Sequence, residues 1–157
     1  MKKIGIYLLL VLLSLSCKKE KKGCTDAEAI NFNAEASSDD GTCTYERDVY
    51  IGVYDAIKTC GIFDSDSSMV FQISRSPDAG NRILLEEFPE TGGILYANVD
   101  LSDVNKIIIP NQTLENALDV SQVSGTGTLS GSSLNLKIYR IDASNTLDSC
   151  SIEATRR

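Results

Sequence analysis

The sequence contains no histidine and no tryptophan. Without histidine the chain lacks the commonest general base and the commonest zinc ligand of proteins, and a Ser-His-Asp catalytic triad is excluded. Acidic residues outnumber basic residues by 22 to 15. Because an acidic protein repels the phosphate backbone of nucleic acids, we expect no binding to DNA or RNA.

No uncharged apolar run in the sequence reaches the roughly 20 residues that a membrane-spanning helix needs. The longest such run, Ile4–Leu15, follows two lysines and is followed by a small residue and then Cys17. This order is typical of a secretory signal peptide. We therefore predict that residues 1–16 are a signal helix that is removed, and that the mature protein begins at Cys17. An uncleaved N-terminal span is the alternative.

The segment that ends at Cys17, Leu-Ser-Leu-Ser-Cys, resembles the lipobox of bacterial lipoproteins. In that family the cysteine sulfur receives a diacylglycerol, and cleavage then frees the cysteine amino group. The resemblance implies that acyl chains such as palmitate on Cys17 hold the protein in the cell envelope, with the outer membrane as the expected location. Ser14 stands where the family usually has an aliphatic residue, so cleavage without acylation stays open.

A short charged run, Lys18–Lys22, follows the predicted lipid site. We expect residues 17–22 to form a flexible, solvated tether. The alternative is a sorting signal, because lipoproteins of Bacteroidota often carry a short charged stretch here that directs them to the cell surface. Those stretches tend to include acidic residues, and in this run only Glu20 is acidic.

Four further cysteines remain once Cys17 is assigned to the lipid. An even number of cysteines in an exported protein indicates two disulfide bonds, for which three pairings exist. We favour Cys24–Cys43, which brackets one compact motif, and Cys60–Cys150, whose members lie in predicted strands. A zinc site formed by the four cysteines is the alternative, and the absence of any C-x-x-C pair argues against it.

Residues 23–45 form a small module that is too short to bury a core of its own. Its apolar residues, among them Ile30 and Phe32, are expected to cover one side of the disulfide. The segment resembles a cysteine module of secreted Bacteroidota proteins, with the pattern GCTD, alanine, Asn-aromatic-Asn, alanine, DDG-S/T-C and a final aromatic residue. The resemblance covers Gly23–Tyr45 and implies a disulfide-closed spacer without catalytic activity.

Oxygen-bearing side chains crowd this module, and oxygen atoms are the ligands that calcium prefers. Their spacing differs from the EF-hand pattern, and hydrogen bonds that cap turns are the alternative role. The candidate calcium ligands are Asp26, Asn31, Asn33, Asp39 and Asp40.

Residues 46–157 contain about eight short segments with the apolar-polar alternation of β-strands. The pattern favours an all-β domain, either an antiparallel barrel or a sandwich. In the clearest segment, Leu134–Ile141, we expect the leucines to face the core and Arg140 to face solvent. Glycine-rich Ser124–Ser133 is predicted to be a flexible hairpin. The expected strands are 48–57, 69–74, 82–88, 94–99, 106–109, 117–123, 134–141 and 147–154.

The same region is similar to small lipoproteins of Bacteroidota with lipocalin-like β-barrels. The resemblance implies a lipocalin-like barrel and no particular chemistry. The residues that carry it are Gly52, Tyr54, Thr59, Cys60, Gly61, Ile109, Pro110, Gln112, Gly125, Gly127 and Cys150.

These features favour a lipid-anchored envelope protein with a binding or structural role and no enzymatic activity. One alternative is a carrier of a small apolar ligand, held in a cavity lined by aromatic residues. Another is a carboxylate-based glycan hydrolase, which needs two acidic side chains facing each other across a cleft. The sequence leaves the partner and the oligomeric state open. The aromatic residues expected in the core, or lining such a cavity, are Phe63, Phe71, Phe88, Tyr96 and Tyr139.

Overall fold

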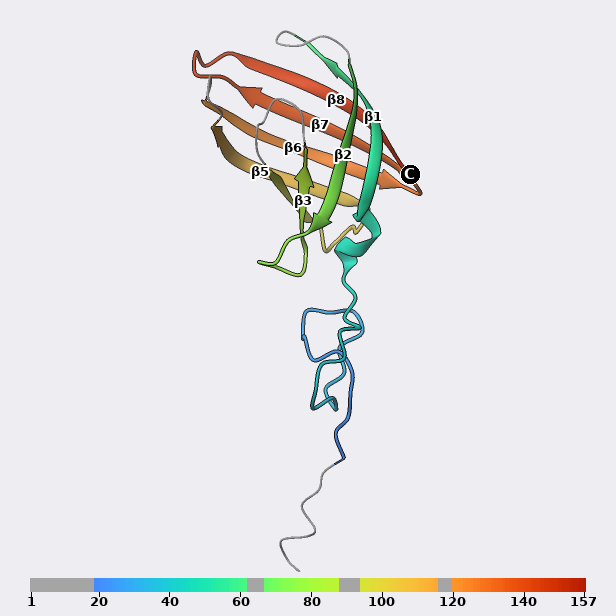
Figure 1. Ribbon diagram of the computed structural model, residues 1–157. Coiled ribbons are helices and arrows are strands. Elements are labelled where there is room, and N and C mark those ends of the chain that lie inside the picture. Colours follow the sequence, from blue (N-terminus) through green and yellow to red (C-terminus); the bar gives the residue numbers. More distant parts are fainter. Residues whose placement is uncertain (1–18, 62–66, 88–93, 116–119) are drawn as a thin grey trace, which may run out of the picture. The chain divides into compact units, whose positions relative to one another are not determined.

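The computed structural model describes residues 19–61, 67–87, 94–115 and 120–157 (Figure 1). The chain divides into two compact units, Met1–Cys43 and Thr44–Arg157. Within the described residues, no helix has the length and apolar character needed to cross a membrane.

The first unit is a small loop structure closed by a disulfide bond between Cys24 and Cys43. Cys24 is buried, with 1% of its surface exposed. Lys21 belongs to this unit, because its carbonyl oxygen accepts hydrogen bonds from the backbone N–H groups of Ser37 (2.8 Å) and Ser38 (3.3 Å). In the sequence, four residues, 17–20, therefore lie between the predicted signal peptide and Lys21.

Ile30 and Phe32 do not cover the disulfide of the first unit, and the prediction for these two residues was wrong. Their exposed fractions are 61% and 45%. Both side chains extend from a tight turn in which the N–H of Phe32 donates to the carbonyl oxygen of Ala29 (3.2 Å). Ala29 is the apolar residue of this turn that is buried.

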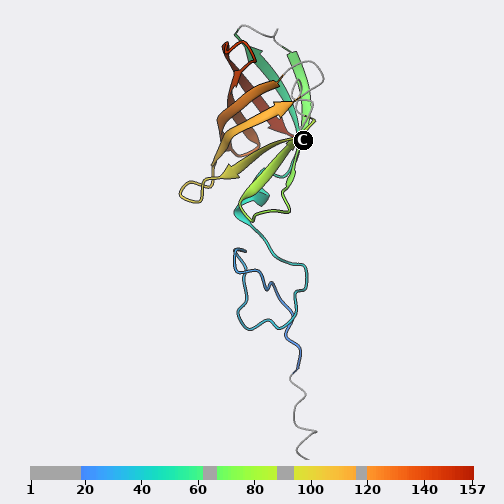
Figure 2. The same ribbon diagram turned by 90° about the vertical axis from the view of Figure 1, so that its left-hand side faces the viewer.

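The second unit is a closed barrel of eight antiparallel strands in chain order, in which the last strand pairs with the first. A short 3-10 helix, η1 (Glu46–Tyr50), precedes the barrel (Figures 1 and 2). This architecture confirms the all-β prediction, and of the two predicted forms it is the antiparallel barrel and not the sandwich. The strands are β1 (Gly52–Cys60), β2 (Ser67–Arg75), β3 (Arg82–Glu86), β4 (Leu95–Val99), β5 (Lys106–Glu115), β6 (Val120–Ser130), β7 (Ser133–Ile141) and β8 (Leu147–Arg156).

Alternation of apolar and polar residues places one row of side chains from each strand inside the barrel. In β2 the buried residues are Met69, Phe71 and Ile73, and the residues between them face outward. The rings of Tyr54 and Phe71 stack in the interior with their centroids 5.4 Å apart. Large side chains thus fill the middle of the barrel. The other fully buried large residues include Ile83, Leu85, Leu95, Val99, Ile107, Ile109, Leu134 and Ile152.

One end of the barrel is closed by η1. The buried hydroxyl of Tyr50 donates to the carbonyl oxygen of Val104 (2.8 Å), and Tyr54 donates to the carbonyl oxygen of Tyr50 (2.8 Å). Burial raises the pKa of the Tyr50 hydroxyl above its ordinary value, so the group stays protonated and remains a donor. Arg156, near the end of β8, donates from Nη1 to the carbonyl oxygen of Val49 (2.8 Å).

Arg47 fastens η1 to the turn between β2 and β3. Its side chain is buried, and Nη1 donates to the carbonyl oxygens of Ser76 (2.8 Å), Ala79 and Arg82 (3.2 Å). Hydrogen bonds from a charged donor are stronger than neutral ones. The helix and this turn are therefore linked by hydrogen bonds and together close one end of the barrel. We call it the η1 end.

The glycine-rich segment Ser124–Ser133 contains a hairpin turn, as predicted, because Ser130 of β6 pairs with Ser133 of β7. Its first part, Ser124–Ser130, belongs to strand β6, so the prediction of a flexible segment was wrong there. Gly125 and Gly127 both occupy buried, inward positions of β6. A Cβ atom on Gly125 would lie 2.4 Å from the carbonyl oxygen of Lys137, and one on Gly127 would lie 2.7 Å from Cγ1 of Ile107. The glycines occur here because neighbouring strands and side chains occupy the space that a side chain would need.

Strands β4 and β5 are joined by few backbone pairs. The paired positions are Asn98 with Ile108 and Val99 with Ile107. Continuing this register would bring Pro110 opposite Tyr96, and proline has no N–H to donate. The side-chain amide of Gln112 bonds the backbone of Tyr96 in place of Pro110. Its Oε1 accepts from the N–H of Tyr96 (3.1 Å), and its Nε2 donates to the carbonyl oxygen of Tyr96 (2.9 Å).

Replacing Gln112 by glutamate is expected to lower the free energy of unfolding by about 2 kcal/mol at neutral pH, because a carboxylate cannot donate to the carbonyl oxygen of Tyr96. The ionised form is disfavoured there, so its pKa is raised on folding and the loss grows as pH rises through that pKa. Urea unfolding at pH 4 and pH 7 measures this difference. Gln122→Glu is the control, since Gln122 is exposed on the outer face of β6. Equal losses in the two variants would contradict the role of Gln112.

Candidate functional site

The end of the barrel opposite η1, where Cys60 and Cys150 are bonded, carries polar residues inside the wall. We call it the disulfide end. Lys58 is 3% exposed and Asp148 is 5% exposed. Arg140 lies opposite Asp148 in the backbone register of β7 with β8 and occupies an inward position of β7. The prediction that Arg140 faces solvent was therefore wrong. Ser121 is also buried, and it belongs to β6, the strand next to β7.

Polar and apolar residues occupy opposite halves of the barrel at the disulfide end. The polar residues come from the four consecutive strands β6, β7, β8 and β1. Strands β2 to β5 contribute buried apolar residues at the same level. The apolar residues are Met69, Leu85, Leu95 and Leu114.

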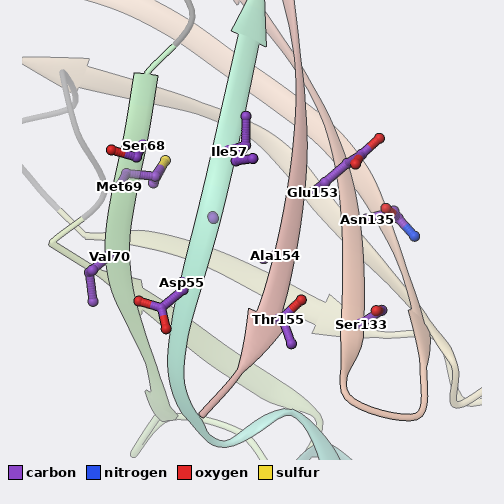
Figure 3. Close-up of a pocket in the computed structure, with 11 residues that line it drawn as sticks. Asp55, Ile57, Ser68, Met69, Val70, Ser133, Asn135, Glu153, Ala154 and Thr155 are labelled. Carbon is purple, nitrogen blue, oxygen red and sulfur yellow. The ribbon is translucent and has the colours of Figure 1, made fainter.

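A groove of about 640 Å³ crosses the outer surface of β2, β1, β8 and β7 (Figure 3). Two rows of outward-facing side chains line it, and each row runs through paired positions of the four strands. The groove is broad and open to solvent, and its lining is polar and apolar in about equal measure. The two rows are Val70, Asp55, Thr155 and Ser133, and Ser68, Ile57, Glu153 and Asn135.

Two carboxylates line this groove at diagonal positions of the pairing between β1 and β8, since Asp55 pairs with Thr155 and Glu153 pairs with Ile57. In Figure 3 they lie apart, Asp55 beside Val70 and Glu153 beside Asn135. Asp55 is held by Arg157, whose Nε donates to Oδ2 at 3.0 Å and whose Nη2 donates to Oδ1 at 2.5 Å. The hydrogen bond from Arg157 lowers the pKa of Asp55, so this carboxyl group stays ionised and is a poor general acid.

The five candidate calcium ligands mostly cap turns. Asp26, Asn33 and Asp39 each accept a backbone N–H from two residues further along the chain, at 2.9 to 3.0 Å. Asp40 accepts from the hydroxyl of Thr42 at 2.6 Å and from its N–H at 3.0 Å, and these bonds lower the pKa of Asp40. Asn31 donates from Nδ2 to the carbonyl oxygen of Thr42 (2.7 Å).

Calcium binding by the first unit stays a prediction. Among the described residues, no three side chains of Asp, Glu, His or Cys are grouped so as to hold a metal ion. The hydrogen bonds favour the alternative role of these groups as turn caps. They explain the turns of the module without a metal ion.

The aromatic residues expected in the core divide into three groups. Phe71 is fully buried in the barrel, as predicted. Tyr96 and Tyr139 lie at outward positions of β4 and β7, and for these two the prediction was wrong. Arg82 covers the ring of Tyr96, with its guanidinium carbon 4.8 Å from the ring centroid, and Lys137 lies 5.6 Å from that of Tyr139. Phe63 and Phe88 lie outside the described residues.

Both predicted disulfide bonds are present, Cys24–Cys43 and Cys60–Cys150. The second joins two positions that face each other in the pairing of β1 with β8. A comparison with models of known protein families gives no match, and no curated protein matches the sequence significantly. The function must therefore be argued from the sequence and the geometry of this chain.

Proposed function

We propose that this chain is a lipid-anchored protein of the bacterial cell envelope whose barrel is a non-catalytic binding domain. The pairing of the cysteines carries the proposal. Two disulfides use Cys24, Cys43, Cys60 and Cys150, and so no cysteine of the chain is left to pair with Cys17. A cysteine directly after a signal peptide, with no disulfide partner, is the acceptor that lipid attachment requires.

The location follows from the resemblance to lipoproteins of Bacteroidota. That resemblance supports an anchor in the outer membrane, with exposure at the cell surface as a further expectation. Two disulfide bonds fit an oxidising compartment outside the cytoplasm. Two or three acyl chains on one cysteine give stable anchoring, whereas a single chain binds only marginally.

Replacing Cys17 by serine in the full chain is expected to move the protein from the membrane to the soluble envelope fraction, because serine offers no thiol for the diacylglycerol. The measurement is fractionation of cells that express each form, followed by detection of the protein. Ser16→Ala is the matched control and is expected to leave the protein in the membrane. A serine variant that remains fully membrane-bound would refute the anchor.

The binding role is supported by the groove on the outer wall and by the absence of histidine from the whole chain. A barrel gives the groove a rigid base, since its strands are paired all the way round. Its lining is open and mixes hydroxyl, amide and carboxylate groups with apolar side chains, which suits the surface of a protein partner better than an enclosed apolar small molecule. A second envelope protein is the partner class that we expect for this surface.

A carrier function is the second candidate, favoured by the arrangement at the disulfide end. Large side chains fill the middle of the barrel, so a ligand would have to bind at this end, where inward residues that are polar on one half and apolar on the other suit a ligand of mixed character. Native mass spectrometry of protein purified from its membrane is the test. A bound small molecule of defined mass is the result expected of a carrier, and a single unliganded mass would eliminate this candidate while leaving the anchor unaffected.

A further inference from the structure

Ile30 and Phe32 form an exposed apolar pair on the small disulfide unit, with 61% and 45% of their surfaces accessible. The turn that carries them is fixed by hydrogen bonds. Asn31, between them, donates from Nδ2 to the carbonyl oxygen of Thr42 (2.7 Å), and the N–H of Phe32 donates to Ala29 (3.2 Å). Both side chains, two residues apart on a fixed turn, are therefore held outward and are available for contact with an apolar surface.

The distance from the predicted lipid site to this unit is short. Lys21 is already bound into it, since the N–H of Lys21 donates to Oγ of Ser37 (3.1 Å) and Nζ forms an ion pair with Glu35 (2.6 Å). Four peptide steps separate Cys17 from Lys21. A fully extended chain covers about 14 Å in four steps. An acylated Cys17 would therefore keep the start of the unit within about 14 Å of the lipid surface.

The charge of the unit decides what kind of lipid surface it fits. Residues 23–45 contain no lysine or arginine and carry the carboxylates of Asp26, Glu28, Glu35, Asp39 and Asp40. An anionic surface would repel these groups. Residues 23–45 therefore fit a zwitterionic surface better than an anionic one, whereas the four lysines of residues 18–22 lie next to the predicted lipid site.

We propose that Ile30 and Phe32 dock the disulfide unit onto a zwitterionic lipid surface, with both side chains inserted at the headgroup boundary. The proposal rests on the proposed acylation of Cys17. Anchoring makes the second contact intramolecular, so a weak intrinsic affinity is enough to populate the docked state. The small unit would then provide a second membrane contact, besides the acyl chains, close to the start of the mature chain.

The absence of tryptophan from the chain allows a direct test. Phe32→Trp introduces a single fluorophore at an exposed site. The mature chain, residues 17–157, is coupled through the thiol of Cys17 to a maleimide lipid in phosphatidylcholine vesicles that contain brominated acyl chains. We expect a blue-shifted emission and loss of roughly half the intensity, because interfacial side chains lie about 5–10 Å into the boundary region. Ile30→Ser in the same protein should reduce that quenching at least in part.

The controls separate the two proposals. Chemical coupling supplies the anchor whether or not cells acylate Cys17, so failure of acylation in cells leaves the vesicle result intact. The same tryptophan protein with Cys17→Ser, mixed with the same vesicles, should show neither shift nor quenching. Unshifted, unquenched emission from the coupled protein would overturn the docking proposal, as would a blue shift already present without vesicles. Ile30→Trp is the second probe should Phe32→Trp fail to form the Cys24–Cys43 bond.

Discussion

Joint replacement of Cys60 and Cys150 by alanine is expected to lower the free energy of unfolding of the barrel by about 4 kcal/mol. The bond spans 90 residues of sequence. It therefore removes a large share of the conformational freedom of the unfolded chain. It also ties β1 to β8, the pair of strands that closes the barrel.

Thermal unfolding followed by circular dichroism measures this effect, and we expect a fall in Tm of roughly 15–20 °C for a domain of this size. Joint replacement of Cys24 and Cys43 is the control. That bond lies in the other compact unit and spans 19 residues, so the transition of the barrel should stay where it is. A change of less than about 1 kcal/mol on loss of Cys60–Cys150 would show that strand pairing alone closes the barrel.

Gly125→Ala is expected to destabilise the barrel by about 3 kcal/mol, at the upper end of the usual cost of overpacking. The new methyl group would lie 2.4 Å from the carbonyl oxygen of Lys137 and 3.2 Å from Cα of Ile138. Both atoms belong to the backbone of the neighbouring strand. No change of rotamer can move them away, so the pairing of β6 with β7 must shift.

Two neighbouring positions provide graded controls for this substitution. Gly127→Ala would meet Cδ2 of Leu136 at 2.6 Å and Cγ1 of Ile107 at 2.7 Å. Both are side-chain atoms that can shift, so this substitution should cost less, about 2 kcal/mol. Thr126→Ala lies between the two glycines on the exposed face and should cost less still. Denaturant unfolding of the three variants gives the order. Equal losses at positions 125 and 126 would contradict the assigned register of β6.

Alternation in the sequence predicted most of the strands because an inward row and an outward row repeat every second residue. It failed at Arg140, where a charged residue occupies an inward position; its charge suggested solvent, while its phase in β7 placed it inside. It also failed at β6. The glycines there indicate flexibility when only neighbours in sequence are considered, and their real surroundings are Ile107, Leu136 and the backbone of β7.

The closure of the barrel and the two candidate sites depend on contacts between distant parts of the chain. Asp55 and Thr155 face each other across the closing seam, a hundred residues apart. No local pattern could reveal that they line one groove. The cysteines were the exception. Their number indicated two disulfide bonds, and the favoured one of the three pairings included Cys60–Cys150, which joins the first strand to the last.

The mass of the N-terminal peptide of the protein isolated from its own membranes tests the central claim most directly. The account predicts a peptide that begins at Cys17 and carries a diacylglycerol on the sulfur, with two or three acyl chains in all. Cleavage at the same bond with an unmodified Cys17 thiol would contradict the anchor, and with it the assignment of this chain as a membrane-held binding protein.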